Sequence, residues 1–119
     1  TEFADMRMAY DALPSDLRDT IEDLSAEFDV LYTRALCGYT EFPEEERKGL
    51  PSAIHRLVKT HPRSGRKTLF IATHACRIVG WPVPEALDLL RELLEFATKP
   101  EFIYTHSWTV RDLVMWDNR

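Results

Sequence analysis

Apolar residues that recur every three or four positions predict three helices along the chain. The first begins near Thr1, a candidate N-cap, and Pro14 ends it. Ser15 is a candidate N-cap for the second helix. The third has the strongest pattern, because Pro84 suits a first helical turn and a broad apolar stripe follows it. The three stripes comprise Phe3, Met6, Tyr10 and Leu13; Leu17, Ile21 and Leu24; and Leu87, Leu90, Leu93, Leu94 and Ala97.

Runs typical of β-strands separate these helices. Residues 55–60 and 67–72 flank a turn rich in Pro, Ser and Gly, which predicts a hairpin. Three further runs are typical of strands: residues 28–33, 102–104 and 113–116. Residues 42–51 are bounded by prolines and change from acidic to basic, so we expect an exposed, mobile loop there. The pattern alone indicates an α+β fold.

Composition narrows the class of protein without identifying it. A hydrophobic fraction of 45% in 119 residues is ordinary for one globular domain. The net charge of -5 argues against a nucleic-acid partner, which would need a clustered basic surface. No apolar run approaches the length of a membrane span, so we expect no membrane partner. Cys37 and Cys76 form no motif, which suits the reducing cytoplasm.

Several motifs, in order along the chain, resemble those of one enzyme family. Residues 60–71 read THPRSGRKTLFI, and residues 97–102 read ATKPEF, followed by HSW at 106–108. The sequence closes on DLVMWDNR, and residues 1–7 read TEFADMR. Together these segments resemble the taurine/2,4-dichlorophenoxyacetate dioxygenase family, whose members are Fe(II)- and 2-oxoglutarate-dependent oxygenases. In that family a Trp-Asp-Asn-Arg turn precedes the distal iron-binding His.

The resemblance implies a fold and a place within it. The expected fold is α+β, part of a double-stranded β-helix (a jelly-roll or cupin-like fold) with helical insertions. Residues 1–119 would form the central part of a single dioxygenase domain. Such enzymes hold Fe(II) with two His and one carboxylate. The resemblance places a His-x-Asp motif before Thr1, and the distal His and a 2-oxoglutarate-binding Arg beyond Arg119. We therefore expect no iron ligand and no catalytic residue within this sequence.

The four histidines are candidate ligands on chemistry alone, but none shows His-x-Asp or i,i+4 spacing. His55, His61 and His106 are interpreted as structural or surface residues. His74 differs, because it follows a strand in a segment that lines the substrate pocket of the resembled enzymes. An imidazole there can bind a substrate carboxylate or ether oxygen, and it titrates near neutral pH. The alternative is a loop histidine bonded to backbone.

Two further sites depend on the resemblance. Thr1 occupies the position of a family Thr whose hydroxyl helps to hold the distal carboxylate of 2-oxoglutarate; a plain N-cap is the alternative. Trp116, Asp117 and Asn118 lie just before the expected iron-binding His. The Trp would shield the metal from water, and its neighbours would fix the turn that orients the ligand. Trp116 as an ordinary core residue is the alternative, and Trp108 is interpreted as core.

The implied function is oxidation of a small anionic organic substrate by O2, with Fe(II) and 2-oxoglutarate as cofactor and cosubstrate. His74 favours a phenoxyacetate-type aryloxyalkanoate, cleaved to a phenol and glyoxylate while succinate and CO2 are released. One alternative is a taurine or alkylsulfonate dioxygenase of the same family. The other is a non-catalytic relative that binds a small acid. Self-association into a homo-oligomer stays open.

Overall fold

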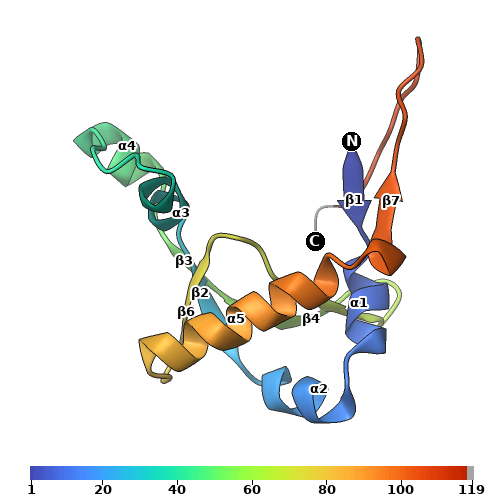
Figure 1. The fold of residues 1–119 in the computed structure, drawn as a ribbon, viewed down its shortest axis with the longest axis horizontal. Coiled ribbons are helices and arrows are strands. Elements are labelled where there is room, and N and C mark those ends of the chain that lie inside the picture. Colours follow the sequence, from blue (N-terminus) through green and yellow to red (C-terminus); the bar gives the residue numbers. More distant parts are fainter. Residues whose placement is uncertain (118–119) are drawn as a thin grey trace.

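The structure, a computed structural model, describes residues 1–117 as two arms rising from a common base (Figure 1). The strands are β1 (Glu2–Ala4), β2 (Ser25–Phe28), β3 (Ala53–Arg56), β4 (Val58–Thr60), β5 (Lys67–Leu69), β6 (Ala75–Ile78) and β7 (Ile103–Thr105). The helices are α1 (Met6–Ala12), α2 (Ser15–Ile21), α3 (Val30–Leu36), α4 (Glu44–Gly49) and α5 (Val83–Ala97), with the 3-10 turn η1 (Pro100–Phe102). The strands pair antiparallel as β1-β7, β3-β2-β6 and β4-β5.

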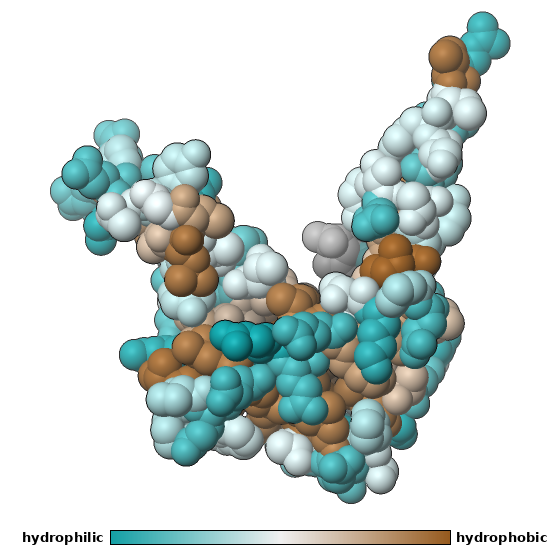
Figure 2. All heavy atoms as spheres, viewed as in Figure 1, coloured by the Kyte–Doolittle hydropathy of each residue, from teal (hydrophilic) through white to brown (hydrophobic). Residues whose placement is uncertain are grey.

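The base holds the hydrophobic core. Helix α5 crosses it, packing on β6 and α1 (Figure 1). Figure 2 shows hydrophobic residues gathered in this base, whereas the tip of the α4 arm is mostly hydrophilic. The largest fully buried side chains are Ile21, Leu57, Leu69 and Leu93. Burial of these chains against one another supplies most of the driving force for folding. The core therefore lies in the base, and helices α3 and α4 contribute no buried residue to it.

The first predicted helix is confirmed, but its N-cap is not Thr1. Residues 2–4 form β1, which pairs with β7, so the helix starts only at Met6. The Asp5 carboxylate accepts hydrogen bonds from the backbone N–H groups of Arg7 (3.0 Å) and Met8 (3.2 Å). Asp5 thereby satisfies two backbone donors that every helix start leaves without a partner. The strand pairing explains why Phe3 lies outside the helical stripe.

The other two predicted helices are also confirmed. Ser15 is the first residue of α2, and Pro14 occupies the N-cap position without a side-chain hydrogen bond, so the predicted Ser15 cap is wrong. Proline suits this junction because its fixed φ is compatible with entry into a helix. Helix α5 has Pro84 in its first turn and buries Leu90, Leu93 and Ala97, as the apolar stripe predicted.

The strand predicted at residues 28–33 is wrong. Strand β2 ends at Phe28, and Asp29 then begins helix α3 by accepting a hydrogen bond from the backbone N–H of Leu31 (2.8 Å). The residues of α3 include Val, Tyr and Thr, which individually favour strands. The cap outweighs that weak preference, because it satisfies a backbone donor that the helix start would otherwise leave unpaired.

The predicted loop at residues 42–51 is exposed, as expected, but it contains helix α4. Three glutamates occupy the first turn of α4, and Arg47 and Lys48 occupy its last turn. This arrangement is favourable, since negative charge stabilises the N-terminal end of a helix and positive charge the C-terminal end. An ion pair between Arg34 and Glu46 fastens α4 to α3. The acidic-to-basic change along the sequence is thus a helix signal.

The predicted hairpin is confirmed in its inner part. Strands β4 and β5 pair with Val58 opposite Leu69 and Thr60 opposite Lys67. Residues 55–56 belong instead to β3, which pairs with β2, and the fully buried Leu57 separates the two strands. Strand β6 was not predicted. One edge strand of the β3-β2-β6 sheet is therefore a segment that the sequence pattern left unassigned.

The predicted strand at 102–104 is confirmed with a small shift, since η1 ends at Phe102 and β7 begins at Ile103. The strand predicted at 113–116 is wrong: residues 106–117 contain no strand. Leu113 and Met115 are 91% and 90% exposed. A strand requires a neighbour for its backbone hydrogen bonds, and the described part of the chain provides none here. No described helix has the length and apolarity needed to cross a membrane.

Candidate functional site

Thr1 lies at the exposed start of β1, where its hydroxyl has a defined position. The indole Nε1–H of Trp108 donates a hydrogen bond to Thr1 Oγ1 (2.8 Å). The backbone of Thr1 also exchanges hydrogen bonds with His106, at 2.7 Å and 3.1 Å. Because the hydroxyl accepts from the indole, its own hydrogen is directed away from Trp108 and suits donation to a carboxylate.

The prediction that Trp108 is a core residue is wrong, because Trp108 is 53% exposed and held by polar contacts. Its ring meets the His106 imidazole edge-on, with 4.7 Å between centroids. His106 Nε2 in turn lies 3.0 Å from Asp112 Oδ2. The side chain and backbone N–H of Thr109 also bond the Asp112 carboxylate, and together with His106 they lower its pKa. An ionised Asp112 therefore anchors His106 and Trp108, which position the Thr1 hydroxyl.

Trp116 contacts strand β1, and Asp117 contacts the turn that follows β4. The Trp116 ring packs on Phe3 of β1 with 5.0 Å between centroids, yet it stays 58% exposed, so the plain core interpretation is wrong. Asp117 Oδ2 lies 3.6 Å from His61 Nε2. Asn118 lies outside the described residues. The structure thus brings Thr1 and Trp116 to one strand and connects Asp117 to the β4–β5 turn.

His61 is fixed by its own turn. The backbone N–H of Ser64 donates to His61 Nδ1 (3.2 Å), and the Ser64 hydroxyl lies 3.1 Å from the same nitrogen. Since Nδ1 accepts a backbone hydrogen bond, the ring proton belongs on Nε2, which faces Asp117. The sequence interpretation of His61 as structural fits this geometry.

His74 lies apart from these residues, between α3 and β6. Its Nδ1 is hydrogen-bonded to Thr33 Oγ1 (2.8 Å), and its carbonyl accepts from the backbone N–H of Asp29 (2.8 Å). Asp29 is the N-cap of α3 and Thr33 lies within this helix, so α3 and its cap hold the half-buried His74. With Nδ1 committed to Thr33, Nε2 is the nitrogen left for a ligand.

Among residues 1–117, no three His, Cys, Asp or Glu side chains come together as a metal would require. The described residues therefore do not fit the iron that the resembled family implies. The Thr1 hydroxyl does suit the carboxylate of 2-oxoglutarate.

Comparison with known proteins decides the family. The model of the taurine catabolism dioxygenase TauD, TfdA family matches residues 1–119. The chain belongs to this family. It is 53% identical, over its whole length, to the alpha-ketoglutarate-dependent 2,4-dichlorophenoxyacetate dioxygenase of Burkholderia sp. strain RASC. The chain spans 40% of the length of that dioxygenase.

Solved structures of this dioxygenase family have the same fold. A Burkholderia xenovorans protein, provisionally named an alpha-ketoglutarate dependent 2,4-D dioxygenase, superimposes with a TM-score of 0.95 and is 58% identical. AAD-2, solved with Mn(II) and N-oxalylglycine, gives a TM-score of 0.91 at 50% identity. The chain covers 46% and 43% of these two structures. The prediction of an α+β part of a jelly-roll dioxygenase is confirmed, as is the dependence of its relatives on 2-oxoglutarate.

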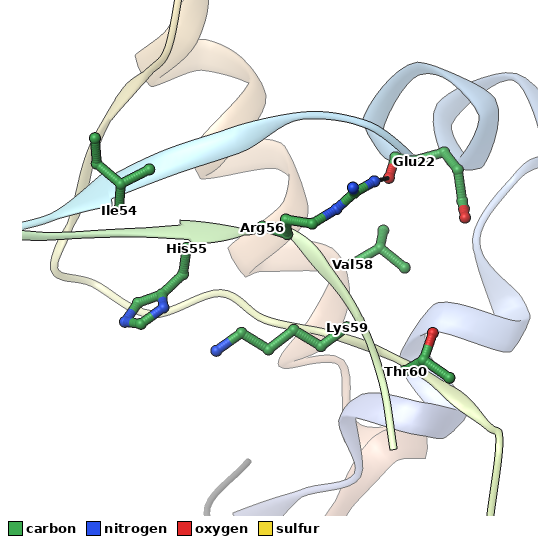
Figure 3. Close-up of a pocket in the computed structure, with 7 residues that line it drawn as sticks. All are labelled: Glu22, Ile54, His55, Arg56, Val58, Lys59 and Thr60. Atoms are coloured by element: carbon green, nitrogen blue, oxygen red, sulfur yellow. Dashed lines mark hydrogen bonds between the residues drawn. The ribbon is translucent and has the colours of Figure 1, made fainter. Parts of the chain in front are cut away.

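Sequence reasoning missed a cationic group at the base of the arms. Lys59 of β4 is half-buried, and its ammonium lies over the Phe70 ring. It lines a pocket together with His55, Arg56 and neighbouring side chains (Figure 3). The available signal was a lysine directly after the apolar pair Leu57–Val58.

Proposed function

We propose that the intact protein is an Fe(II)- and 2-oxoglutarate-dependent dioxygenase that cleaves aryloxyalkanoates. The observation that carries this proposal is the 53% identity, over the whole chain, to a 2,4-dichlorophenoxyacetate dioxygenase. The second support is the Thr33-held His74, whose Nε2 is left for an anionic or ether-containing ligand. Taurine-type structures are more distant, at 24% and 26% identity. In this proposal residues 1–119 are the central part of one domain, and the iron ligands belong to other segments.

The proposed reaction consumes O2, 2-oxoglutarate and the aryloxyalkanoate. One oxygen atom of O2 enters the substrate carbon between the ether oxygen and the carboxylate, and the other enters succinate, with loss of CO2 from 2-oxoglutarate. The resulting hemiacetal then collapses. The bond between the hydroxylated carbon and the ether oxygen breaks. The ether oxygen, which stays on the aryl group, takes the proton of the new hydroxyl, and the carbon becomes the aldehyde carbon of glyoxylate. The products are a phenol, glyoxylate, succinate and CO2.

Within this function the predicted site residues receive separate roles. Thr1 donates its hydroxyl hydrogen to the distal carboxylate of 2-oxoglutarate, while Trp108 holds its oxygen. His74 donates from Nε2 to the substrate. Trp116 packs on β1 and Asp117 contacts His61, and these two contacts hold the segment that precedes Asn118.

The test is a comparison of substrates with the intact protein. Purified protein is supplied with Fe(II), 2-oxoglutarate and either phenoxyacetate or taurine, and phenol and succinate are measured. Equal amounts of phenol and succinate from phenoxyacetate would support the proposal. Succinate released with taurine alone would instead indicate an alkylsulfonate dioxygenase. Binding of 2-oxoglutarate without turnover of any acid would indicate a non-catalytic small-acid-binding relative.

We also propose that the protein is cytoplasmic and that its partners are small molecules, not nucleic acids or membranes. We further propose that it forms a homo-oligomer. Sedimentation of the intact protein tests the oligomer, and fractionation of the cells that produce it tests its compartment.

A further inference from the structure

Lys59 lies on an aromatic cluster formed by three rings from three different segments. Its Nζ is 3.2 Å from the centroid of the Phe70 ring. Phe70 meets Phe28 and His55 edge-on, with centroid distances of 5.2 Å and 5.1 Å, and Phe28 lies 5.7 Å from His55. This geometry places a cation beside a continuous aromatic surface at the base of the two arms.

A pocket of about 610 Å³ lies beside this cluster, and Phe28 and Phe70 are not among the residues that line it. Lys59 and His55 both line it, and Figure 3 shows their side chains on the same side of the β3–β4 segment, with the ammonium directed toward the imidazole. The remaining lining residues are Glu22, Ile54, Arg56, Val58 and Thr60. Pockets of this volume accept small organic ligands.

The other charged groups at this pocket already have partners. Arg56 pairs with Asp23 (2.7 Å) and also donates to the Glu22 carbonyl (2.9 Å). The Glu22 carboxylate is engaged by Lys67 and by the Tyr10 hydroxyl. Neither of these groups is therefore available to neutralise a further charge in the pocket.

Lys59 differs from them in having no anionic partner among residues 1–117. Burial alone lowers the pKa of its ammonium, because no nearby carboxylate opposes that effect. The Phe70 ring offsets part of the desolvation, but an aromatic face cannot accept the three N–H donors of an ammonium as a carboxylate does. His55 likewise has ring contacts but no hydrogen bond within the described part of the chain. Two nitrogen donors thus face one pocket without an acceptor.

We propose that Lys59, with His55 beside it, binds the carboxylate of the organic substrate. A carboxylate supplies the missing acceptor and charge. The identification of that acid as an aryloxyalkanoate rests on the proposed function. The 2-oxoglutarate carboxylate has the same chemistry and is distinguished by experiment.

The experiment measures binding to the intact protein by titration calorimetry. The ligands are phenoxyacetate, its uncharged analogue anisole, and N-oxalylglycine with Mn(II). The variants are Lys59→Met, which keeps the chain length but removes the charge, and Lys59→Arg, which restores a cation. The matched control is Lys99→Met, because Lys99 also lies over a ring, with 4.3 Å from its Nζ to the centroid of Phe96, but outside this pocket.

Lys59→Met is expected to weaken phenoxyacetate binding roughly 10- to 100-fold, the usual effect of losing a charge-assisted hydrogen bond. Binding of anisole and N-oxalylglycine should stay unchanged, Lys59→Arg should recover part of the loss, and Lys99→Met should bind like the wild type. A loss confined to N-oxalylglycine would assign the pocket to the cosubstrate and overturn the proposal. Unchanged phenoxyacetate binding in a folded Lys59→Met protein would overturn it as well.

The same measurement separates this inference from the proposed function. A wild-type protein that binds phenoxyacetate through Lys59 but releases no phenol would contradict the proposed reaction and leave the carboxylate site standing. Turnover that is insensitive to Lys59→Met, in kcat and in KM, would contradict the site and leave the reaction standing.

Discussion

The His61 imidazole and the Asp117 carboxylate lie 3.6 Å apart, joining the turn between β4 and β5 to the last described residue of the chain. Ser64 fixes the imidazole from its other side through Nδ1. The hairpin thereby restrains a segment whose residues Leu113 and Met115 are almost fully exposed. In the same segment, Trp116 packs on Phe3, and the Asp112 carboxylate accepts hydrogen bonds from the backbone N–H and the hydroxyl of Thr109.

Replacing His61 should loosen this segment with little effect on global stability. A contact between partly exposed side chains contributes about 0–1 kcal/mol, so the free energy of unfolding should change by no more than about 1 kcal/mol. His61→Asn retains an acceptor for Ser64, and His61→Gln retains a donor that reaches toward Asp117. Backbone hydrogen exchange of residues 112–117 should accelerate in His61→Asn and stay near the wild-type rate in His61→Gln. Equal rates in both variants would mean that the contact does not restrain the segment.

Removing the N-cap of α1 should destabilise the protein. Asp5→Ala leaves the backbone N–H groups of Arg7 and Met8 without their acceptor and should cost about 1 kcal/mol in urea denaturation. Asp19→Ala is the control, because Asp19 is an exposed residue within α2 rather than a cap. An equal loss in both variants would indicate a charge effect and not a capping effect.

Truncation of the core should have a much larger effect. Leu93 is fully buried in α5, and Leu93→Ala should lower the free energy of unfolding by about 2–5 kcal/mol through lost burial and the cavity that remains. Leu36→Ala removes the same atoms from an exposed position at the end of α3 and should change little. A small effect of Leu93→Ala would show that α5 is not central to the core of the intact protein.

Stability should fall at acid pH partly through Glu22. The hydrogen bond from Lys67, and then that from Tyr10, lowers the pKa of the Glu22 carboxyl below its ordinary value of 4.5. A depressed folded-state pKa contributes stability that is present above the unfolded value and is lost as the pH falls through the folded value. Glu22→Gln should therefore flatten the decline of Tm below about pH 4.5. Glu41→Gln, at an exposed position, should leave that decline unchanged.

Thr33 should affect substrate binding through His74. Thr33→Val removes the hydroxyl bonded to His74 Nδ1, whereas Thr33→Ser keeps it. If His74 contacts substrate, the valine variant should raise KM about 5-fold, equivalent to a hydrogen bond of about 1 kcal/mol, with a smaller change in kcat. The serine variant should behave like the wild type. Identical KM values in all three proteins would remove His74 from the substrate site.

Much of the fold follows from sequence pattern where local signals and tertiary contacts agree. Helix α5 has a continuous apolar stripe and a favourable proline, and the β4–β5 hairpin has its turn residues, so both were predicted. The strand predicted at residues 28–33 failed because one side-chain cap, Asp29, outweighed the strand preference of the residues that follow. The strand predicted at 113–116 failed because pairing depends on a neighbour, which local pattern cannot supply.

The candidate site was predictable only in part, and for a related reason. Thr1, His74 and Trp116 were selected by resemblance, but their partners Trp108, Thr33 and Phe3 lie far away in sequence or were assigned other roles. The position of Lys59 over Phe70 depends on two strands meeting, and no local motif marks it. Contacts made across the fold therefore carry the information that the linear pattern lacks.

The buried Leu57 between β3 and β4 has a consequence for how this protein can vary. Side chains alternate between faces along a strand, so inserting or deleting one residue here would exchange the environments of Val58 and Lys59. A lysine would then be driven into the hydrophobic interior while a valine faced the pocket. We therefore expect this stretch to tolerate changes of side chain far better than changes of length. Insertions that arise by chance should survive elsewhere, such as in the exposed connection between α3 and α4.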